Sequence, residues 1–206
     1  MKKTKLLLLI SLICFYLLMI ASSCTKQEIE VPMLEINDGG LLSGLPCSAP
    51  CFWNISPGIT TEKEAVGILS TLGDIDKCDK WDAIENGADK GIGCNNLWIT
   101  FNEQGLVSRI SYTITPPVAL EDLIKIYGDP DHISVTAEGI QSEGPLIMLL
   151  MYDQEHMVVG FQPQNATNFL LLPNTLIDHI QYCENRIYEN IITSMIDTWN
   201  GYGKYQ

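Results

Sequence analysis

Basic residues are scarce in this sequence of 206 residues: 12 Lys and Arg stand against 25 Asp and Glu, a formal net charge of −13 at pH 7. Phosphate binding needs a basic stripe or patch, so this balance excludes nucleic acid as a partner. Catalytic motifs are missing too, since there is no Gly-x-Ser-x-Gly elbow, His-Glu-x-x-His helix, phosphate loop or dinucleotide fingerprint. The sequence therefore favours a protein that is not an enzyme and uses no cofactor.

Metal-binding patterns are equally weak. An acidic cluster fits the length of a calcium loop from Asp74 to Glu85, but Asp79 occupies the position where such a loop needs a turn glycine. Zinc would need His or further Cys at close spacing. The three histidines share no ligand spacing and fall on different predicted elements: His132, His156 and His179. We therefore predict no metal site.

The N-terminus carries the strongest signal in the sequence. Three lysines precede a 15-residue apolar run over residues 6–20, and small residues follow at 21–23. This order predicts a secretory signal peptide over residues 1–23. As a helix the run is about 22 Å long, which is short for the about 30 Å of a bilayer core. Ala21-Ser22-Ser23-Cys24 resembles the bacterial lipobox, and the resemblance implies that Cys24 becomes the lipidated N-terminus. The alternative is ordinary signal cleavage beside an incidental cysteine.

Loss of the signal peptide makes the chain more acidic. Without residues 1–23, 9 basic residues remain against 25 acidic ones, a net charge of −16. Anionic headgroups repel such a body, so attachment to the membrane must come from the acyl chains. We expect a protein of the cell envelope, outside the cytoplasm, whose partners are the membrane, through the lipid anchor, and another envelope protein.

Export also suggests a role for the cysteines. Outside the cytoplasm the expected use of cysteine is the disulfide bond. Cys78 and Cys94 flank a Gly-rich stretch and are predicted to close it, while Cys47 and Cys51 can form a small loop. Cys183 can instead take one member of that second pair, because sequence alone does not choose among the pairings.

Local patterns predict the first elements of the folded body. Residues 24–46 are polar and acidic without a sustained period, which is typical of a flexible tether. A helix is predicted over residues 61–73, because Thr61 and Glu64 form a capping box and apolar residues follow at helical spacing. Alternating apolar residues around a Gly-containing turn predict an antiparallel hairpin over residues 97–114.

The same order then recurs. An apolar helix pattern ending at Gly128 repeats the first one 55 residues later, and residues 149–161 repeat the hairpin at an offset of 51. We therefore predict an α+β fold, a tandem repeat of helix plus antiparallel β-hairpin in two units, 47–115 and 116–163, that share one sheet. Apolar residues spaced three and four apart predict a C-terminal helix over residues 174–199.

A family resemblance rests on two short motifs. Ile55-Ser56-Pro57-Gly58-Ile59-Thr60, with the capped helix and hairpin after it, resembles the unit of small envelope lipoproteins. It is similar to modules of the beta-lactamase-inhibitor-protein type and of outer-membrane-assembly lipoproteins. Pro50-Cys51-Phe52-Trp53 also resembles uncharacterised bacterial lipoproteins that open with Pro-Cys-Trp. The resemblance covers residues 46–163 and implies an extracytoplasmic binding or scaffolding module, with no catalytic residue to carry over.

The function predicted from the sequence is non-catalytic binding or scaffolding of another macromolecule, through a sheet face or the hairpin loops. Trp53, Trp81 and Trp98 are candidate contact residues, since interfaces are enriched in such side chains, although the alternative for each is a place in the core. The alternative is a receptor for a soluble ligand or an enzyme inhibitor, with its site in the cleft between the two units. A hydrolase is the third class, and it needs a nucleophile, a base and an orienting group within hydrogen-bond reach.

Overall fold

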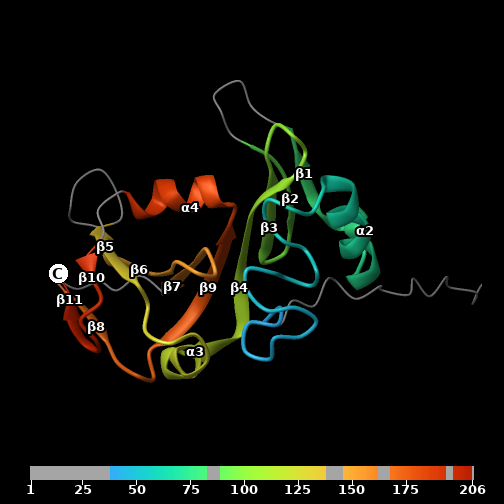
Figure 1. Cartoon of the computed structure of the whole chain (residues 1–206). Helices are drawn as coiled ribbons and strands as arrows, with labels where there is room; N and C mark the ends of the chain where they lie inside the picture. The colour runs from blue at the N-terminus through green and yellow to red at the C-terminus, as the bar shows by residue number, and fades with distance from the viewer. Residues whose placement is uncertain (1–37, 83–88, 138–145, 162–167, 194–196, 206) are drawn as a thin grey trace, which may run out of the picture. The chain divides into compact units, whose positions relative to one another are not determined.

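The computed structural model describes residues 38–82, 89–137, 146–161, 168–193 and 197–205. In these residues nine antiparallel strands form one sheet in the order β1-β2-β3-β4-β9-β7-β6-β5-β10, and β8 pairs with β11 in a small second sheet (Figure 1). The strands are β1 (Asp79–Trp81), β2 (Lys90–Cys94), β3 (Leu97–Phe101), β4 (Val107–Ala119), β5 (His132–Ala137), β6 (Leu146–Tyr152), β7 (Met157–Phe161), β8 (Phe169–Leu171), β9 (Leu176–Cys183), β10 (Asp197–Thr198) and β11 (Gly203–Tyr205). The helices of the same residues are α2 (Glu62–Leu72), α3 (Leu120–Tyr127), α4 (Asn185–Ile192) and the short 3-10 helix η1 (Ile75–Lys77).

The first predicted helix is confirmed as α2. The Thr61 hydroxyl accepts a hydrogen bond from the N–H of Glu64, and the Glu64 carboxylate accepts one from the N–H of Thr61 at 2.9 Å. This capping box satisfies two of the amides that the start of a helix leaves unpaired. Ala65 and Leu69 are fully buried in the main core, so the apolar face seen in the sequence is the face that packs.

Other local predictions are confirmed as well. The hairpin over residues 97–114 is formed by β3 and the first part of β4. The second helix is α3, which ends at Gly128 with a φ of +81°, a conformation that favours glycine. The hairpin over residues 149–161 is formed by β6 and β7. Each of these elements depends on contacts between residues near one another in the chain, which is why the sequence pattern indicates it.

The predicted closing helix over residues 174–199 is wrong. Most of its first half is β9, a central strand that pairs with β4 on one side and β7 on the other, and only α4 is helical. Where β7 advances by one residue, from Gly160 to Phe161, its partners in β9 advance by two. This bulge separates the buried Ile177 and Ile180 by three residues instead of two. A strand interrupted in this way imitates the spacing of a helix.

The predicted tandem repeat is also wrong. The described chain is mostly β, and a nine-stranded antiparallel sheet is not a repeat of helix plus hairpin. The strand β9, from late in the chain, lies between β4 and β7 and joins the two hairpins. In addition, β4 runs without interruption through the predicted boundary between residues 115 and 116. The open edges of both hairpins explain this arrangement, because an unpaired strand edge needs a partner and sequence pattern does not say which strand supplies it.

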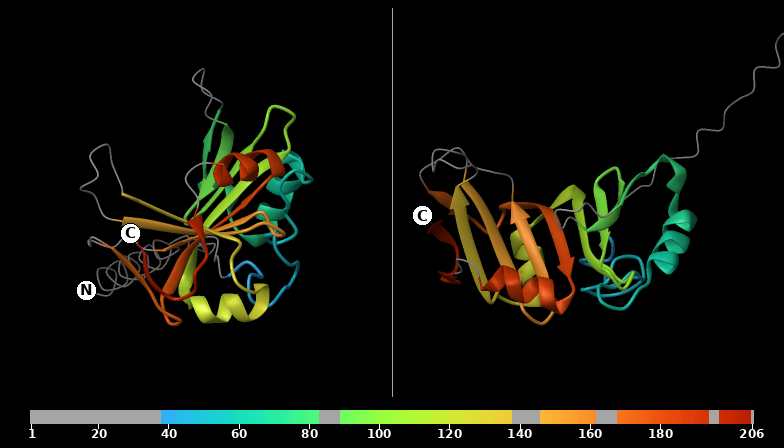
Figure 2. Two further views of the ribbon diagram at one scale, coloured as in Figure 1. Left: turned by 60° about the vertical axis from the view of Figure 1, so that its left-hand side comes forward. Right: turned by 90° about the horizontal axis from the view of Figure 1, so that it is seen from above.

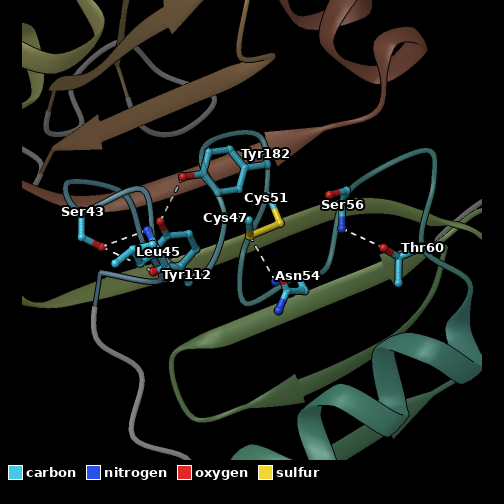
Figure 3. Close-up of a disulfide and its surroundings, with 9 residues drawn as sticks. All are labelled: Ser43, Leu45, Cys47, Cys51, Asn54, Ser56, Thr60, Tyr112 and Tyr182. Atoms are coloured by element: carbon cyan, nitrogen blue, oxygen red, sulfur yellow. Dashed lines mark hydrogen bonds between the residues drawn. A yellow bond between two sulfur atoms is a disulfide. The ribbon is translucent and has the colours of Figure 1, made fainter.

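The folded body begins earlier than the predicted tether allows. Leu41 is 1% exposed and belongs to the main core, and the hydroxyl of Tyr127 donates to its carbonyl at 2.6 Å. The hydroxyl of Tyr112 donates to the carbonyl of Asp38 at 3.1 Å. The same hydroxyl lies 3.4 Å from that of Tyr182 (Figure 3). The prediction of a tether to residue 46 is therefore wrong from Asp38 onwards. Residues 1–37, with the predicted signal peptide and Cys24, lie outside the described residues.

The two faces of the sheet are covered differently. The main core lies on one face, where α2, α3 and the segment that starts at Asp38 pack on Ile99, Ile110 and Ile180. On the opposite face, a smaller core joins α4 to β6, β7 and β9. Figure 1 and Figure 2 show α4 over this end of the sheet, with β1, β2 and β3 at the other end.

Candidate binding surface

Two glycines leave one face of β2 without side chains. Gly91 lies opposite Trp81 of β1, and Gly93 lies opposite Trp98 of β3. Directly opposed residues share a face of the sheet, and residues two apart in one strand do so too. Both indoles therefore project on the same side of β2. The pattern Gly-x-Gly in a strand marks a place where something must approach the backbone closely.

The indole of Trp81 fills the space above these glycines. A Cβ atom added at Gly91 would lie 2.2 Å from Cζ2 of Trp81, and one added at Gly93 would lie 3.3 Å from Cζ3. The indole N–H donates to the carbonyl of Asp89 at 2.9 Å, which holds the ring in place. Trp98 reaches the same glycine from the other side, because its Cδ1 would be 3.1 Å from a Cβ at Gly93. Trp98 is 41% exposed, while Trp81 is half-buried.

We name this feature the Trp81–Trp98 surface; it consists of Trp81, Gly91, Gly93 and Trp98 with their polar neighbours on β3, β4 and β9. The register places Thr100 and Arg109 in the row of Trp81, and Ser111 and Gln181 in the row of Trp98. The outer neighbour of Gly93 is Asp79, an exposed residue of β1. Between β1 and β4 these two rows contain no aliphatic side chain.

Hydrogen bonds fix several of the polar neighbours. The Thr100 hydroxyl lies 2.9 Å from that of Ser108, and the Ser111 hydroxyl lies 3.0 Å from Nε2 of His179. Burial lowers the pKa of His179, so this imidazole is neutral at pH 7. Hydroxyls and a neutral imidazole can both donate and accept hydrogen bonds. The surface therefore combines aromatic rings with polar groups that carry little net charge.

A disulfide holds the edge of this surface. Cys78 precedes β1 directly and Cys94 ends β2, and the predicted Cys78–Cys94 bridge is present with a Cα–Cα distance of 4.5 Å. Because β1 has only three residues, its pairing with β2 is short. The bridge fastens this strand, and thus Trp81, to its neighbour. The glycines were predicted to belong to a closed-off stretch, but Gly91 and Gly93 lie inside β2.

The second predicted bridge, Cys47–Cys51, is also present, in the segment drawn in Figure 3. The N–H of Asn54 lies 3.1 Å from Sγ of Cys47, so the loop folds back on its own disulfide. Trp53, the third candidate contact residue, follows this loop and packs partly buried against the main core. The main core occupies the opposite face of the sheet, and Trp53 is therefore not part of the Trp81–Trp98 surface.

Cys183 is free and buried at the point where the surface meets α4. It lies opposite Arg109 in the register and accepts a hydrogen bond from the Gln181 side chain at 3.1 Å. Burial raises the pKa of the thiol, and the neighbouring Gln181 and Arg109 offset only part of this effect. The thiol stays protonated at neutral pH and is a poor nucleophile.

A second polar group lies beneath α4. Asp153, in the turn between β6 and β7, accepts a hydrogen bond from the Tyr188 hydroxyl at 2.8 Å and lies 3.2 Å from Nε2 of His132. The N–H of Asp153 donates to the Asp131 carboxylate at 2.8 Å, and His156 stacks on Tyr188 with ring centroids 5.2 Å apart. Burial and the neighbouring Asp153 raise the pKa of Tyr188, so its phenol remains a donor.

This group joins two histidines that lie 24 residues apart in the chain. A hydrolase would need a hydroxyl or thiol on the imidazole. Among the described residues no Ser, Thr or Cys side chain hydrogen-bonds His132, which pairs with Asp153 alone. The group ties α4 to the β6–β7 turn. Tyr188 and Asp153 were missed because neither matches a motif and their contact spans 35 residues.

The acidic cluster considered for calcium is dispersed. Asp74 caps η1 by accepting from the N–H of Asp76 at 3.2 Å, and it lies 3.7 Å from the ammonium of Lys77. Glu85 lies outside the described residues. In the described stretches no group of three or more His, Cys, Asp or Glu side chains is placed to hold a metal ion.

One cleft lies between α2 and the β1–β2 edge. Its walls include apolar and charged side chains of α2, β1, β2 and β3: Glu62, Val66, Lys80, Lys90, Ile92 and Phe101. The Lys90 ammonium lies 2.7 Å from the Glu62 carboxylate, and this pairing raises the pKa of Lys90. The pair is well exposed, so it adds little stability.

No helix in the described part of the chain has the length and apolar character needed to cross a bilayer. Comparison with known proteins found no matching family model, no matching curated protein and no matching solved structure. Function must therefore be inferred from the sites themselves.

Proposed function

We propose that this protein is a lipid-anchored protein of the cell envelope whose folded body is a non-catalytic binding or scaffolding module. The acyl chains on Cys24 attach it to the membrane, and the Trp81–Trp98 surface holds a macromolecular partner. The observation that carries the binding role is the position of Trp98, which is 41% exposed beside Trp81 on a floor of glycine. Large aromatic side chains that stay exposed on an ordered sheet are characteristic of contact surfaces.

The binding role is supported by the several features of the fold that hold the two tryptophan rings in position. Two glycines in β2 make room for the rings, the Asp89 carbonyl orients one of them, and the Cys78–Cys94 bridge secures the strand that carries it. A rigid aromatic surface loses little conformational entropy when a partner binds. The support for the anchor is the sequence of residues 21–24, together with the basic and apolar segments before it.

The anchor is tested by intact mass of the protein from native membranes, with and without reductant. A chain that starts at Cys24, carries acyl groups and gains two hydrogen atoms for each of its two bridges on reduction is the expected result. The variant Cys24→Ala should then leave the membrane fraction. A mass of the uncleaved or unacylated chain refutes the anchor.

The binding role is tested by photo-crosslinking in intact cells. A crosslinking amino acid placed at Trp98 should capture a partner, while the same group at Leu170 should not. Leu170 is a matched control because it is 42% exposed and lies in the small sheet of β8 and β11. Equal capture at both positions, or capture at Leu170 alone, contradicts the proposal.

A further inference from the structure

The chemical character of the Trp81–Trp98 surface narrows the kind of partner. In the row of Trp81, the side chains after Gly91 are those of Thr100 and Arg109. In the row of Trp98, Gly93 and Asp79 lie to one side, and Ser111 and Gln181 lie to the other. The two charges, Asp79 and Arg109, are of opposite sign.

Four classes of partner fit this surface poorly. Nucleic acids and sulfated polymers need clustered positive charge. A lipid surface or the centre of a protein interface needs contiguous apolar side chains. On this face aliphatic side chains begin only at β7 and β6, where Val158 and Met151 are buried against α4.

Aromatic rings that lie among hydroxyl, amide and imidazole groups fit a sugar. One face of a pyranose ring presents C–H groups that stack on an indole, while its edge presents hydroxyls that both donate and accept hydrogen bonds. The indole of Trp81 lies against the backbone of β2, so its other face is turned away from the strand. Thr100 and Ser111 supply hydroxyls next to the rings, and both are partly exposed.

We propose that the Trp81–Trp98 surface binds an uncharged pyranose polymer. This inference rests on the proposed function, because it names the class of partner for the same surface. With strands about 4.8 Å apart and residues about 3.4 Å apart along them, the Cα atoms of the two tryptophans are roughly 12 Å apart. That span matches a short run of sugar units better than a single sugar. The polymer can be the glycan backbone of the cell's own wall or a polysaccharide from outside.

The test uses the full-length protein purified from membranes in a detergent without a sugar headgroup. Binding is measured by tryptophan fluorescence and calorimetry with cellohexaose, xylohexaose and chitohexaose, and by co-sedimentation with isolated wall sacculi. We expect at least one hexasaccharide to bind. The sacculi distinguish the two sources, because binding to them as well as to chitohexaose identifies the wall as the source.

Three variants assign binding to the surface. Trp98→Ala should weaken binding at least about tenfold, as expected when one stacked ring is lost, and Trp98→Phe should retain most of it. Leu170→Ala, which removes a side chain of the same exposure elsewhere, should bind as the wild type does. Thermal unfolding of all variants establishes that they are folded.

Three results would overturn the inference, and they separate it from the proposed function. If no hexasaccharide and no sacculus binds while crosslinking at Trp98 still captures a protein, the sugar is wrong and the binding role stands. If a hexasaccharide binds equally well to Trp98→Ala, the site is wrong. If neither sugar nor crosslinked partner is found, both proposals fail.

Discussion

Substitution of Gly91 by Ala tests whether the Trp81 ring requires a residue without a side chain at this position of β2. The new Cβ would lie 2.2 Å from Cζ2 of Trp81 and 2.8 Å from the carbonyl oxygen of Ile99, both well inside van der Waals contact. The Trp81 ring is held by its hydrogen bond to the Asp89 carbonyl, and the Ile99 carbonyl belongs to the paired strand β3, so both have little freedom to move. Forced overpacking of this kind costs about 1–3 kcal/mol.

The same substitution at two other glycines gives a graded control. A Cβ at Gly93 meets Cδ1 of Trp98 at 3.1 Å, and Trp98 is exposed enough to yield, so the cost should be smaller. A Cβ at Gly67 in α2 meets nothing within 4 Å. There Ala should stabilise the protein by about 0.5–1 kcal/mol, because glycine is a poor helix former.

The assay is urea unfolding followed by tryptophan fluorescence and circular dichroism, with thermal unfolding as a second measurement. For a chain of this size about 1 kcal/mol corresponds to a shift of about 2–4 °C in the melting temperature. We expect stability to rise in the order Gly91→Ala, Gly93→Ala, wild type, Gly67→Ala. If Gly91→Ala is as stable as the wild type, or if Gly67→Ala loses as much as Gly91→Ala, the steric reasoning is refuted.

Three further predictions concern the rest of the fold. Tyr188→Phe removes the hydrogen bond to Asp153 and should lower the free energy of unfolding by about 1 kcal/mol. Tyr152→Phe should be neutral or stabilising, because the buried Tyr152 hydroxyl has no hydrogen-bond partner among the described residues. Equal losses in urea unfolding would contradict this prediction. Replacement of both Cys78 and Cys94 by Ala should lower the free energy of unfolding by about 3 kcal/mol. That loss is about 1 kcal/mol larger than the loss expected without the shorter Cys47–Cys51 loop, because a longer loop restricts the unfolded chain more. A larger loss in urea unfolding for the Cys47–Cys51 pair would argue against this reasoning. The free energy of unfolding should fall as pH rises above about 10, by up to about 1.4 kcal/mol per pH unit for each buried tyrosine. The cause is that phenols in the unfolded chain lose protons that the folded ones retain. A free energy of unfolding that stays constant between about pH 9.5 and 11.5 would show this prediction to be wrong. Burial raises the pKa of four such phenols above the ordinary value of 10.0: Tyr112, Tyr152, Tyr182 and Tyr188.

The sign of the pH effect follows from which state binds more protons. A phenol whose folded pKa is raised contributes its full stabilisation below the unfolded pKa and loses it as the pH passes through the folded value. The tyrosines therefore add nothing to pH dependence at neutral pH. Acidification should likewise leave them protonated in both states, so any acid-induced unfolding must come from other groups.

Parts of the candidate surface could be foreseen and parts could not. Trp81 and Trp98 were candidates from their residue type, and Gly91-x-Gly93 was visible as a Gly-rich stretch. Their convergence was not visible, because it depends on β2 lying between β1 and β3 with a particular register. A one-residue change in register would send the indoles to opposite faces of the sheet. The pairing of His132 and Asp153 was hidden for the same reason.

What the sequence by itself determined is local. The capping box at Thr61, the glycine after α3, the two hairpins and the Cys78–Cys94 bridge were predicted from residues that lie close together in the chain, where short-range hydrogen bonds and loop closure dominate. The sequence left open whether Cys47 pairs with Cys51 or with Cys183, and the structure shows Cys47–Cys51. Tertiary structure decided the rest. The segment from Leu176 to Cys183 becomes a central strand because two open strand edges can be satisfied only by a partner between them, and this long-range pairing outweighs a local spacing that resembles a helix.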